Sequence, residues 1–137
     1  MSRIYLIIIG FLFFSNQSKS QFTVIINAQK VPAVQQGDTL FVAGNFNGWN
    51  PSKTMLTKTK NAWTVTLENI PSDLQFKFTK GGWSRVEVDA GGNQIENRFF
   101  NIQSDTVLNL TIARFSNPNK PIPKKHTKSS QVRVMDT

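Results

Sequence analysis

The chain contains no cysteine, one histidine and one tyrosine among its 137 residues. Because cysteine is absent, we expect no disulfide and no membrane tether through a lipidated N-terminal cysteine, so that stability depends on the hydrophobic core. The histidine, His126, lies in a proline- and lysine-rich stretch, where nothing would hold it in register with a nucleophile. The sequence also lacks His, Asp and Glu at metal-ligand spacing and the Gly-x-Ser-x-Gly turn of α/β-hydrolases. We therefore expect no catalytic site, no cofactor and no metal in this chain.

Acidic residues are scarce, and they concentrate only at Glu87, Asp89 and Glu96. A strand would put the carboxylates of Glu87 and Asp89 on one face, and a pair of carboxyl groups is what glycoside hydrolysis requires. Alternating charges are more often a solvated strand face, and this is the interpretation that we favour. The run that begins at Asp89 and ends at Asn93 has too few carboxylates for a calcium loop, and a tight hairpin turn explains it better.

Basic residues outnumber acidic ones, 16 to 8, but the excess lies at the ends of the chain. Residues 21–115 contain 9 basic and 7 acidic residues, so this central part is close to neutral. The strong basicity of the whole chain therefore does not predict binding to nucleic acid or to a membrane surface.

The sequence has one long apolar run, from Ile4 to Phe14, interrupted only by a glycine and the hydroxyl of a tyrosine. A helix of this length spans roughly 17 Å, against about 30 Å for the hydrocarbon core of a bilayer, so it is too short for a membrane span. It suits a secretory signal peptide, and Ser18-Lys19-Ser20 supplies the small residues that signal peptidase recognises. We expect residues 1–20 to be removed before Gln21, which predicts a secreted or periplasmic protein without membrane contact. The alternative is a cytosolic protein with an apolar N-terminal strand.

Residues 21–115 show the period-2 alternation of strands and no convincing helical stripe. The predicted strands include Phe22–Ile26, Thr39–Ala43, Ala62–Glu68, Leu74–Thr79 and Val107–Ile112. Glycine, proline, asparagine and aspartate separate these runs, as in an all-β antiparallel sandwich. About 95 residues suffice for one core.

Residues 116–137 have a different composition. Three prolines and several lysines predict an extended linker, which Ser130–Thr137 follows with the beginning of an alternating pattern. We interpret 116–137 as a linker and the possible start of a missing downstream domain, and a frayed C-terminal tail is the alternative.

Three tryptophans occur in the central part, in different contexts. Trp63 is in phase with Val65 and Leu67, which assigns it to the core or its rim. Trp49 lies on a turn rich in asparagine and glycine, and Trp83 follows two glycines, so both are expected to project from loops. Exposed aromatic planes beside planar or long polar side chains suit sugars, which present apolar ring faces edged with hydroxyls. The candidates for the polar role are Lys77, Asn97 and Arg98.

Taken in order, these motifs resemble the starch- and glycogen-binding modules of carbohydrate-binding module families 20 and 48, which include the glycogen-binding domain of AMP-activated kinase β subunits. The resemblance rests on Phe41–Pro51, Trp63–Leu67, Leu74–Phe78, Trp83 and Asn97-Arg98. It implies an immunoglobulin-like sandwich of about seven strands over residues 21–115. It also implies that Trp49 and Trp83 stack on α-glucose units, while Lys77 and Asn97 bond to sugar hydroxyls.

The chain departs from the usual family pattern after the strand that contains Phe76-Lys77-Phe78. The family often has Trp-Glu followed by Asp-Pro-Asn-Arg, whereas this chain has Trp83-Ser84-Arg85, then a glycine-rich insertion and Ile95–Arg98. This variant, with its lysine-rich linker, resembles the N-terminal modules of secreted bacterial esterases of the α/β-hydrolase type.

These features predict a non-catalytic module that binds an α-glucan polysaccharide and holds an attached hydrolase or esterase near its substrate. The downstream catalytic domain would be the second partner. The alternative is a structural spacer or protein-interaction sandwich that has lost sugar binding, with its loop tryptophans packed on a neighbouring domain.

Overall fold

The computed structural model describes residues 21–32, 34 and 36–120. The predicted signal peptide and residues 121–137 of the predicted linker and tail lie outside these residues. The described part forms ten strands and one short 3-10 helix, η1. Their bounds are β1 (Phe22–Lys30), β2 (Phe41–Gly44), β3 (Thr54–Met55), β4 (Thr57–Lys58), β5 (Trp63–Ile70), β6 (Asp73–Thr79), η1 (Trp83–Arg85), β7 (Glu87–Val88), β8 (Arg98–Asn101), β9 (Thr106–Thr111) and β10 (Arg114–Phe115). No helix in this part of the chain is both long enough and apolar enough to cross a bilayer.

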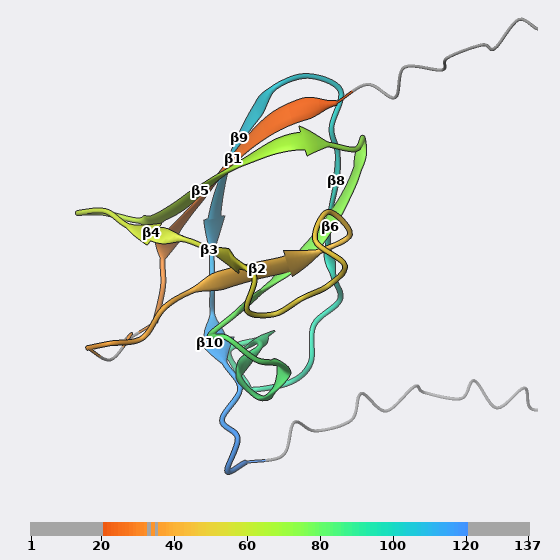
Figure 1. Ribbon diagram of the computed structural model, residues 1–137. Coiled ribbons are helices and arrows are strands. Elements are labelled where there is room, and N and C mark those ends of the chain that lie inside the picture. The colour runs from red at the N-terminus through yellow and green to blue at the C-terminus, as the bar shows by residue number, and fades with distance from the viewer. Residues whose placement is uncertain (1–20, 33, 35, 121–137) are drawn as a thin grey trace, which may run out of the picture.

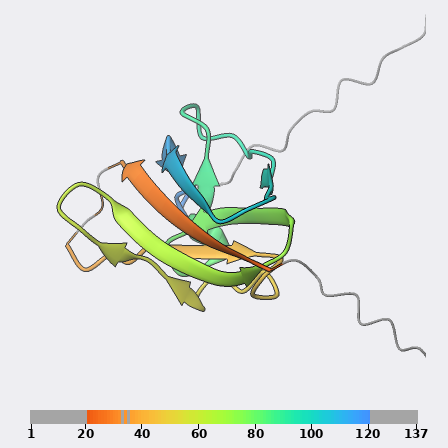
Figure 2. The same ribbon diagram turned by 90° about the horizontal axis from the view of Figure 1, so that it is seen from above.

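Two four-stranded sheets form the layers of a sandwich (Figures 1 and 2). The first sheet has the order β4-β5-β1-β9, the second has the order β3-β2-β6-β8, and β10 pairs with β7 in a small third sheet. The all-β sandwich predicted from the alternation is confirmed. One pairing departs from a purely antiparallel arrangement, because β1 and β9 run parallel.

The core lies between the two sheets and is built from alternate residues of their strands. On β5, Trp63 and Leu67 are buried, and Val65 packs against the same cluster, as predicted. Phe76 on β6 meets Phe78 edge-on at 5.5 Å and stacks on Phe100 of β8 at 5.8 Å. The contact between Phe76 and Phe100 joins β6, which carries Lys77, to β8, which begins directly after Asn97.

The segment after β6 is more irregular than a single strand. Gly81 has a φ of +96°, which favours glycine, and the chain then forms η1 before the two-residue strand β7. The hairpin turn predicted at Asp89–Asn93 is present, since the amide of Asp89 donates to the carbonyl of Asn93 at 3.0 Å.

Candidate functional site

The turn between β2 and β3 is held by the side chain of Asn47. Its amide oxygen accepts from the backbone N–H of Gly44 at 3.0 Å. Its amide nitrogen donates at 2.9 Å both to the carbonyl of Val42 and to the hydroxyl of Thr54. One asparagine therefore connects both strands with the loop between them, and it fixes the part of the chain that presents Trp49.

Trp49 itself has a left-handed backbone, with a φ of 58°, directly after Gly48 with a φ of 66°. For a bulky residue this conformation costs roughly 1–2 kcal/mol. The residue is partly buried, and its backbone N–H donates to the carbonyl of Gly44 at 2.9 Å. Strain of this kind persists only where surrounding contacts enforce it, and it is concentrated at binding sites.

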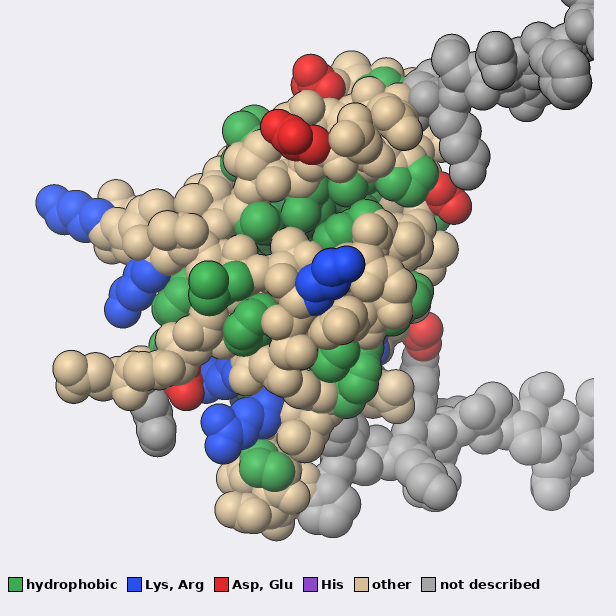
Figure 3. All heavy atoms as spheres, viewed as in Figure 1, with side chains coloured by type: hydrophobic (Ala, Val, Ile, Leu, Met, Phe, Trp, Pro, Cys, Tyr) green, Lys and Arg blue, Asp and Glu red, His purple; other side chains and the backbone are tan. Residues whose placement is uncertain are grey.

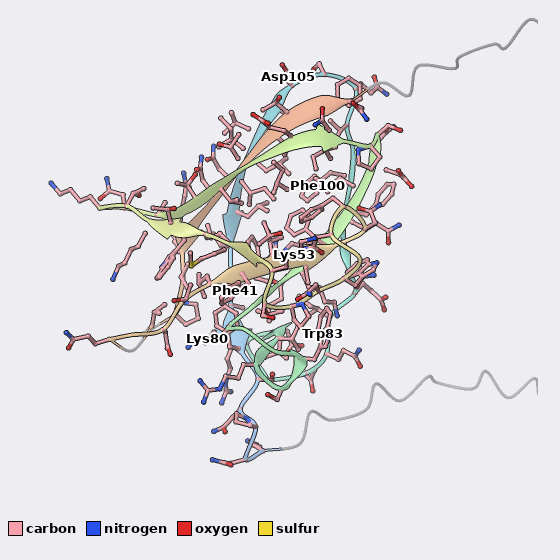
Figure 4. All side chains as sticks on the ribbon, in the orientation of Figure 1. Phe41, Lys53, Lys80, Trp83, Phe100 and Asp105 are labelled. Atoms are coloured by element: carbon pink, nitrogen blue, oxygen red, sulfur yellow. The ribbon has the colours of Figure 1, made fainter. Side chains whose placement is uncertain are left out.

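Trp83 lies on the loop that follows β6 and is 44% exposed, as its flanking glycines predict. Figure 4 labels Trp83 and Phe41, both in the part of the molecule below the centre of the second sheet. The loop approaches the ring of Phe41 closely, because a Cβ added to Gly81 would lie 3.4 Å from its Cε2 atom. The β2 aromatic thus supports the glycine turn that leads to Trp83.

A single buried hydroxyl connects the two tryptophan loops. Thr79, the last residue of β6, is fully buried. Its Oγ1 donates to the carbonyl of Pro51 in the first loop at 2.6 Å and accepts from the N–H of Gly81 in the second loop at 3.2 Å. Both loops are therefore anchored at the same strand end.

Lys77 and Asn97 lie together at one cavity. Lys77 is on the outward face of β6, yet only 7% of it is exposed, and its Nζ donates to the carbonyl of Ile95 at 2.7 Å. Lys77 and residues 94–97 line a cavity of about 300 Å³. Asn97 is exposed at its edge, whereas the two tryptophans are outside its lining.

Arg98, the third polar candidate, faces the opposite way. Its guanidinium pairs with the carboxylate of Glu87, with Nη2 to Oε2 at 2.7 Å, and also donates to the carbonyl of Thr111. The Glu87 carboxylate is almost fully buried and accepts the N–H of Phe78 as well. These contacts give Arg98 and Glu87 a structural role, and they argue against both a sugar contact by Arg98 and a catalytic carboxylate at Glu87.

Asp89 is held by its own turn. Its carboxylate accepts from the backbone N–H of Asn93 at 2.7 Å and from the side-chain amide of Asn93 at 3.0 Å. The side-chain hydrogen bond from Asn93, followed by the backbone one, lowers the pKa of Asp89 below its ordinary value of 3.8. Among residues 21–32, 34 and 36–120, no group of three His, Cys, Asp or Glu is placed to hold a metal ion.

Three residues near the candidate site were not identified from sequence. In the sequence, Thr79 is only the polar last residue of an alternating strand. Phe99 on β8 and Met55 on β3 are 59% and 60% exposed, although their residue types suggest burial. For Phe99 a signal existed, because strand alternation from Asn97 puts Arg98 inward and Phe99 outward.

No family model matches the chain. It is 31% identical over 93 residues to an amylopullulanase of Thermoanaerobacter thermohydrosulfuricus, a match that covers 62% of this chain and 6% of that protein. It is 33% identical over 64 residues to an alpha-amylase of Niallia circulans, covering 43% of this chain and 5% of that protein. The chain therefore spans only a small fraction of the length of either enzyme, and its distant similarity is to a short segment of each.

Proposed function

We propose that the protein binds α-glucan chains of the starch or glycogen type through Trp49, Trp83, Lys77 and Asn97, without catalysis of its own. The main support is the anchoring of both tryptophan loops by Thr79, on the strand that also carries Lys77. On this proposal the protein acts outside the cell after loss of residues 1–20, and it holds an attached hydrolase or esterase close to the polysaccharide.

The chemistry of the four side chains suits a sugar chain. An indole offers a flat apolar surface for the C–H face of a glucose ring, while an ammonium and an amide bond to its hydroxyls. Covering half of each indole contributes roughly 1–2 kcal/mol. Two indoles with a few hydrogen bonds support a Kd of about 10 µM to 1 mM. Such weak single-site binding suits a polymer that offers many sites.

The comparisons support the same ligand class. The similar proteins are named as an amylopullulanase and an alpha-amylase, and each resembles this chain over a stretch of the size of one small domain. A short segment shared with two much longer enzymes fits an accessory module better than a catalytic domain.

Affinity electrophoresis of the purified protein tests the proposal, with native gels containing soluble starch, glycogen, xylan or no sugar. We expect retardation by starch and glycogen. Trp49→Ala and Trp83→Ala should each raise the Kd about 5- to 30-fold, since each removes about 1–2 kcal/mol of stacking. Val107→Ala is the matched control, because Val107 is 55% exposed on β9 of the other sheet.

The thermal midpoint separates this function from the spacer alternative. Surface substitutions usually change stability by less than about 0.5 kcal/mol, so Trp83→Ala, at a position that is 44% exposed, should melt close to the wild type. Absence of retardation in every gel, or a large loss of stability in Trp83→Ala with sugar binding unchanged, would support a spacer and contradict the proposal.

A further inference from the structure

A second set of polar and aromatic side chains lies along the outer edge of the second sheet. Residues alternate along β8, so that Phe100 packs against the core and Arg98 pairs with Glu87 on the inner side. Asn97, Phe99 and Asn101 are all exposed and point to the outer side. We call these three residues the β8 stripe.

The β8 stripe is continuous with the candidate site. Asn97 lines the cavity that it shares with Lys77. Phe99 is the register partner of Gln75 on β6. Gln75 lies two residues before Lys77 and on the same outward face of that strand. Alternate residues on a strand are about 6.7 Å apart, so the β8 stripe extends for about 13 Å from Asn97 to Asn101.

The far end of the β8 stripe opens into another cavity. Asn101 is paired with Asp73, and both line a space of about 480 Å³ together with Phe22 and Gln103. The wall of this space therefore combines an aromatic ring with amides and a carboxylate. The backbone of Asp73 is also fixed by the turn that follows β2, because the side-chain amide of Asn45 donates to its carbonyl at 2.6 Å.

The composition of the β8 stripe favours a sugar over an apolar protein surface. A single exposed phenylalanine is ordinary on a protein surface, but Phe99 lies between two asparagines and beside a glutamine. An apolar partner that covered Phe99 would also desolvate these amides without offering them hydrogen bonds. A sugar ring covers the aromatic face and supplies hydroxyls to the amides at the same time.

We propose that the β8 stripe is an extension subsite for the same α-glucan chain, which runs from the Lys77–Asn97 cavity over Phe99 towards Asn101. The inference rests on the proposed function and adds a preference for chain length. Short oligosaccharides occupy only the tryptophan loops and the Lys77–Asn97 cavity, whereas longer chains also stack on Phe99.

Isothermal titration of the purified protein with maltotriose and with maltoheptaose tests this subsite. The wild type should bind maltoheptaose about tenfold more tightly than maltotriose. Phe99→Ala should remove most of this difference by weakening maltoheptaose about 5- to 10-fold, with maltotriose unchanged. Asn101→Ala should weaken only maltoheptaose, by about threefold. Val107→Ala, an exposed apolar position on the other sheet, should change neither affinity.

The outcomes separate the two proposals. If the wild type binds neither sugar, the proposed function itself fails. If the wild type binds both sugars with equal affinity, the extension subsite is overturned while sugar binding stands. The same holds if Phe99→Ala weakens the affinity for both sugars equally, or for neither. Analytical sedimentation of the wild type and Phe99→Ala supplies a further check. If only the wild type forms a dimer, the β8 stripe contacts a second copy of the chain, and the subsite is overturned.

Discussion

Trp49 has a backbone conformation that costs stability. Its left-handed backbone would suit glycine or asparagine, and glycine is found just before it. The hydrogen bonds of Asn47 hold the turn in this shape before any ligand is present. A side chain that is already oriented loses less entropy on binding, so the strained turn is consistent with a recognition role.

Asp89 provides a test at the level of a single hydrogen bond. Its pKa is lowered chiefly by the side chain of Asn93, so Asn93→Ala should bring the pKa back up towards 3.8. Because the pKa of Asp89 is lowered in the folded protein, its carboxylate stabilises the turn at any pH above the ordinary pKa of 3.8. This contribution is lost as the pH falls through the folded-state pKa, which lies below 3.8. An NMR titration of the Asp89 carboxyl carbon in both proteins measures the difference. Identical pKa values would show that the Asn93 amide does not act on this carboxylate.

The roles of individual residues could be predicted from sequence where the local pattern decides them. Trp63 is in the core and Trp83 is on an exposed loop, as their neighbours indicate. Arg98 could not be assigned by residue type, because its partner Glu87 is on another strand and their contact depends on tertiary structure. The positive φ of Trp49 could not be predicted from the sequence either, because the Asn47 contacts that hold the turn join residues of two strands.

Among the elements, β6 organises both the core and the candidate site. Leu74, Phe76 and Phe78 fill the core from one side of the strand. Lys77 on the other side reaches the 94–97 segment, and Thr79 at the strand end reaches both tryptophan loops. A change in the position of this strand would therefore move every residue of the proposed site.

Thr79→Val tests whether the two loops depend on the end of β6. Valine keeps the shape of threonine but leaves the carbonyl of Pro51 and the N–H of Gly81 without their partner. We expect a loss of about 1–3 kcal/mol in the free energy of unfolding, measured by urea denaturation. The Kd for starch should also rise about tenfold, because both tryptophans lose their fixed positions. Thr66→Val, at an exposed position of β5, is the matched control.

A variant with reduced stability and unchanged affinity would contradict the idea that Thr79 positions the loops. The hydroxyl would then be structural only, and the tryptophans would be oriented by contacts within each loop.

The long strands could be predicted from sequence, but the short ones and the pairing could not. Alternation over at least five residues located β1, β5, β6 and β9 within a few positions. The strands β3, β4, β7 and β10 have two residues each, too few for a period to show. The parallel pairing of β1 with β9 joins positions about 80 residues apart, as Val24 with Thr106 shows, and local patterns carry no information about such partners.

At the scale of the whole molecule, the outer faces of the two sheets differ. On the first sheet, the side chain of Asn27 bonds both to Asn109 of β9 and to Thr64 of β5, so polar groups there satisfy one another. Among the described residues, the first sheet exposes one large apolar side chain, Val107, whereas the second exposes Phe99 and Met55 and adjoins the loops that carry Trp49 and Trp83. This asymmetry favours the second sheet as the face that recognises a ligand.

The distribution of charge gives a last prediction about the ligand. Residues 21–115 hold 9 basic and 7 acidic residues, and Figure 3 shows both signs on the face in view. A neutral glucan bound by stacking and hydrogen bonds should be insensitive to salt. Raising NaCl from about 0.1 M to about 1 M shortens the screening length from about 10 Å to about 3 Å, and the Kd for maltoheptaose should change less than about twofold.

Dextran sulfate supplies the contrast in the same titration. Dextran sulfate is a polyanion, so any binding that it shows depends on charge and should weaken steeply with salt. If maltoheptaose behaved in the same way, charge rather than stacking would dominate recognition. The roles of Trp49 and Trp83 as platforms for a neutral sugar would then be untenable, because stacking on an indole does not depend on the screening length.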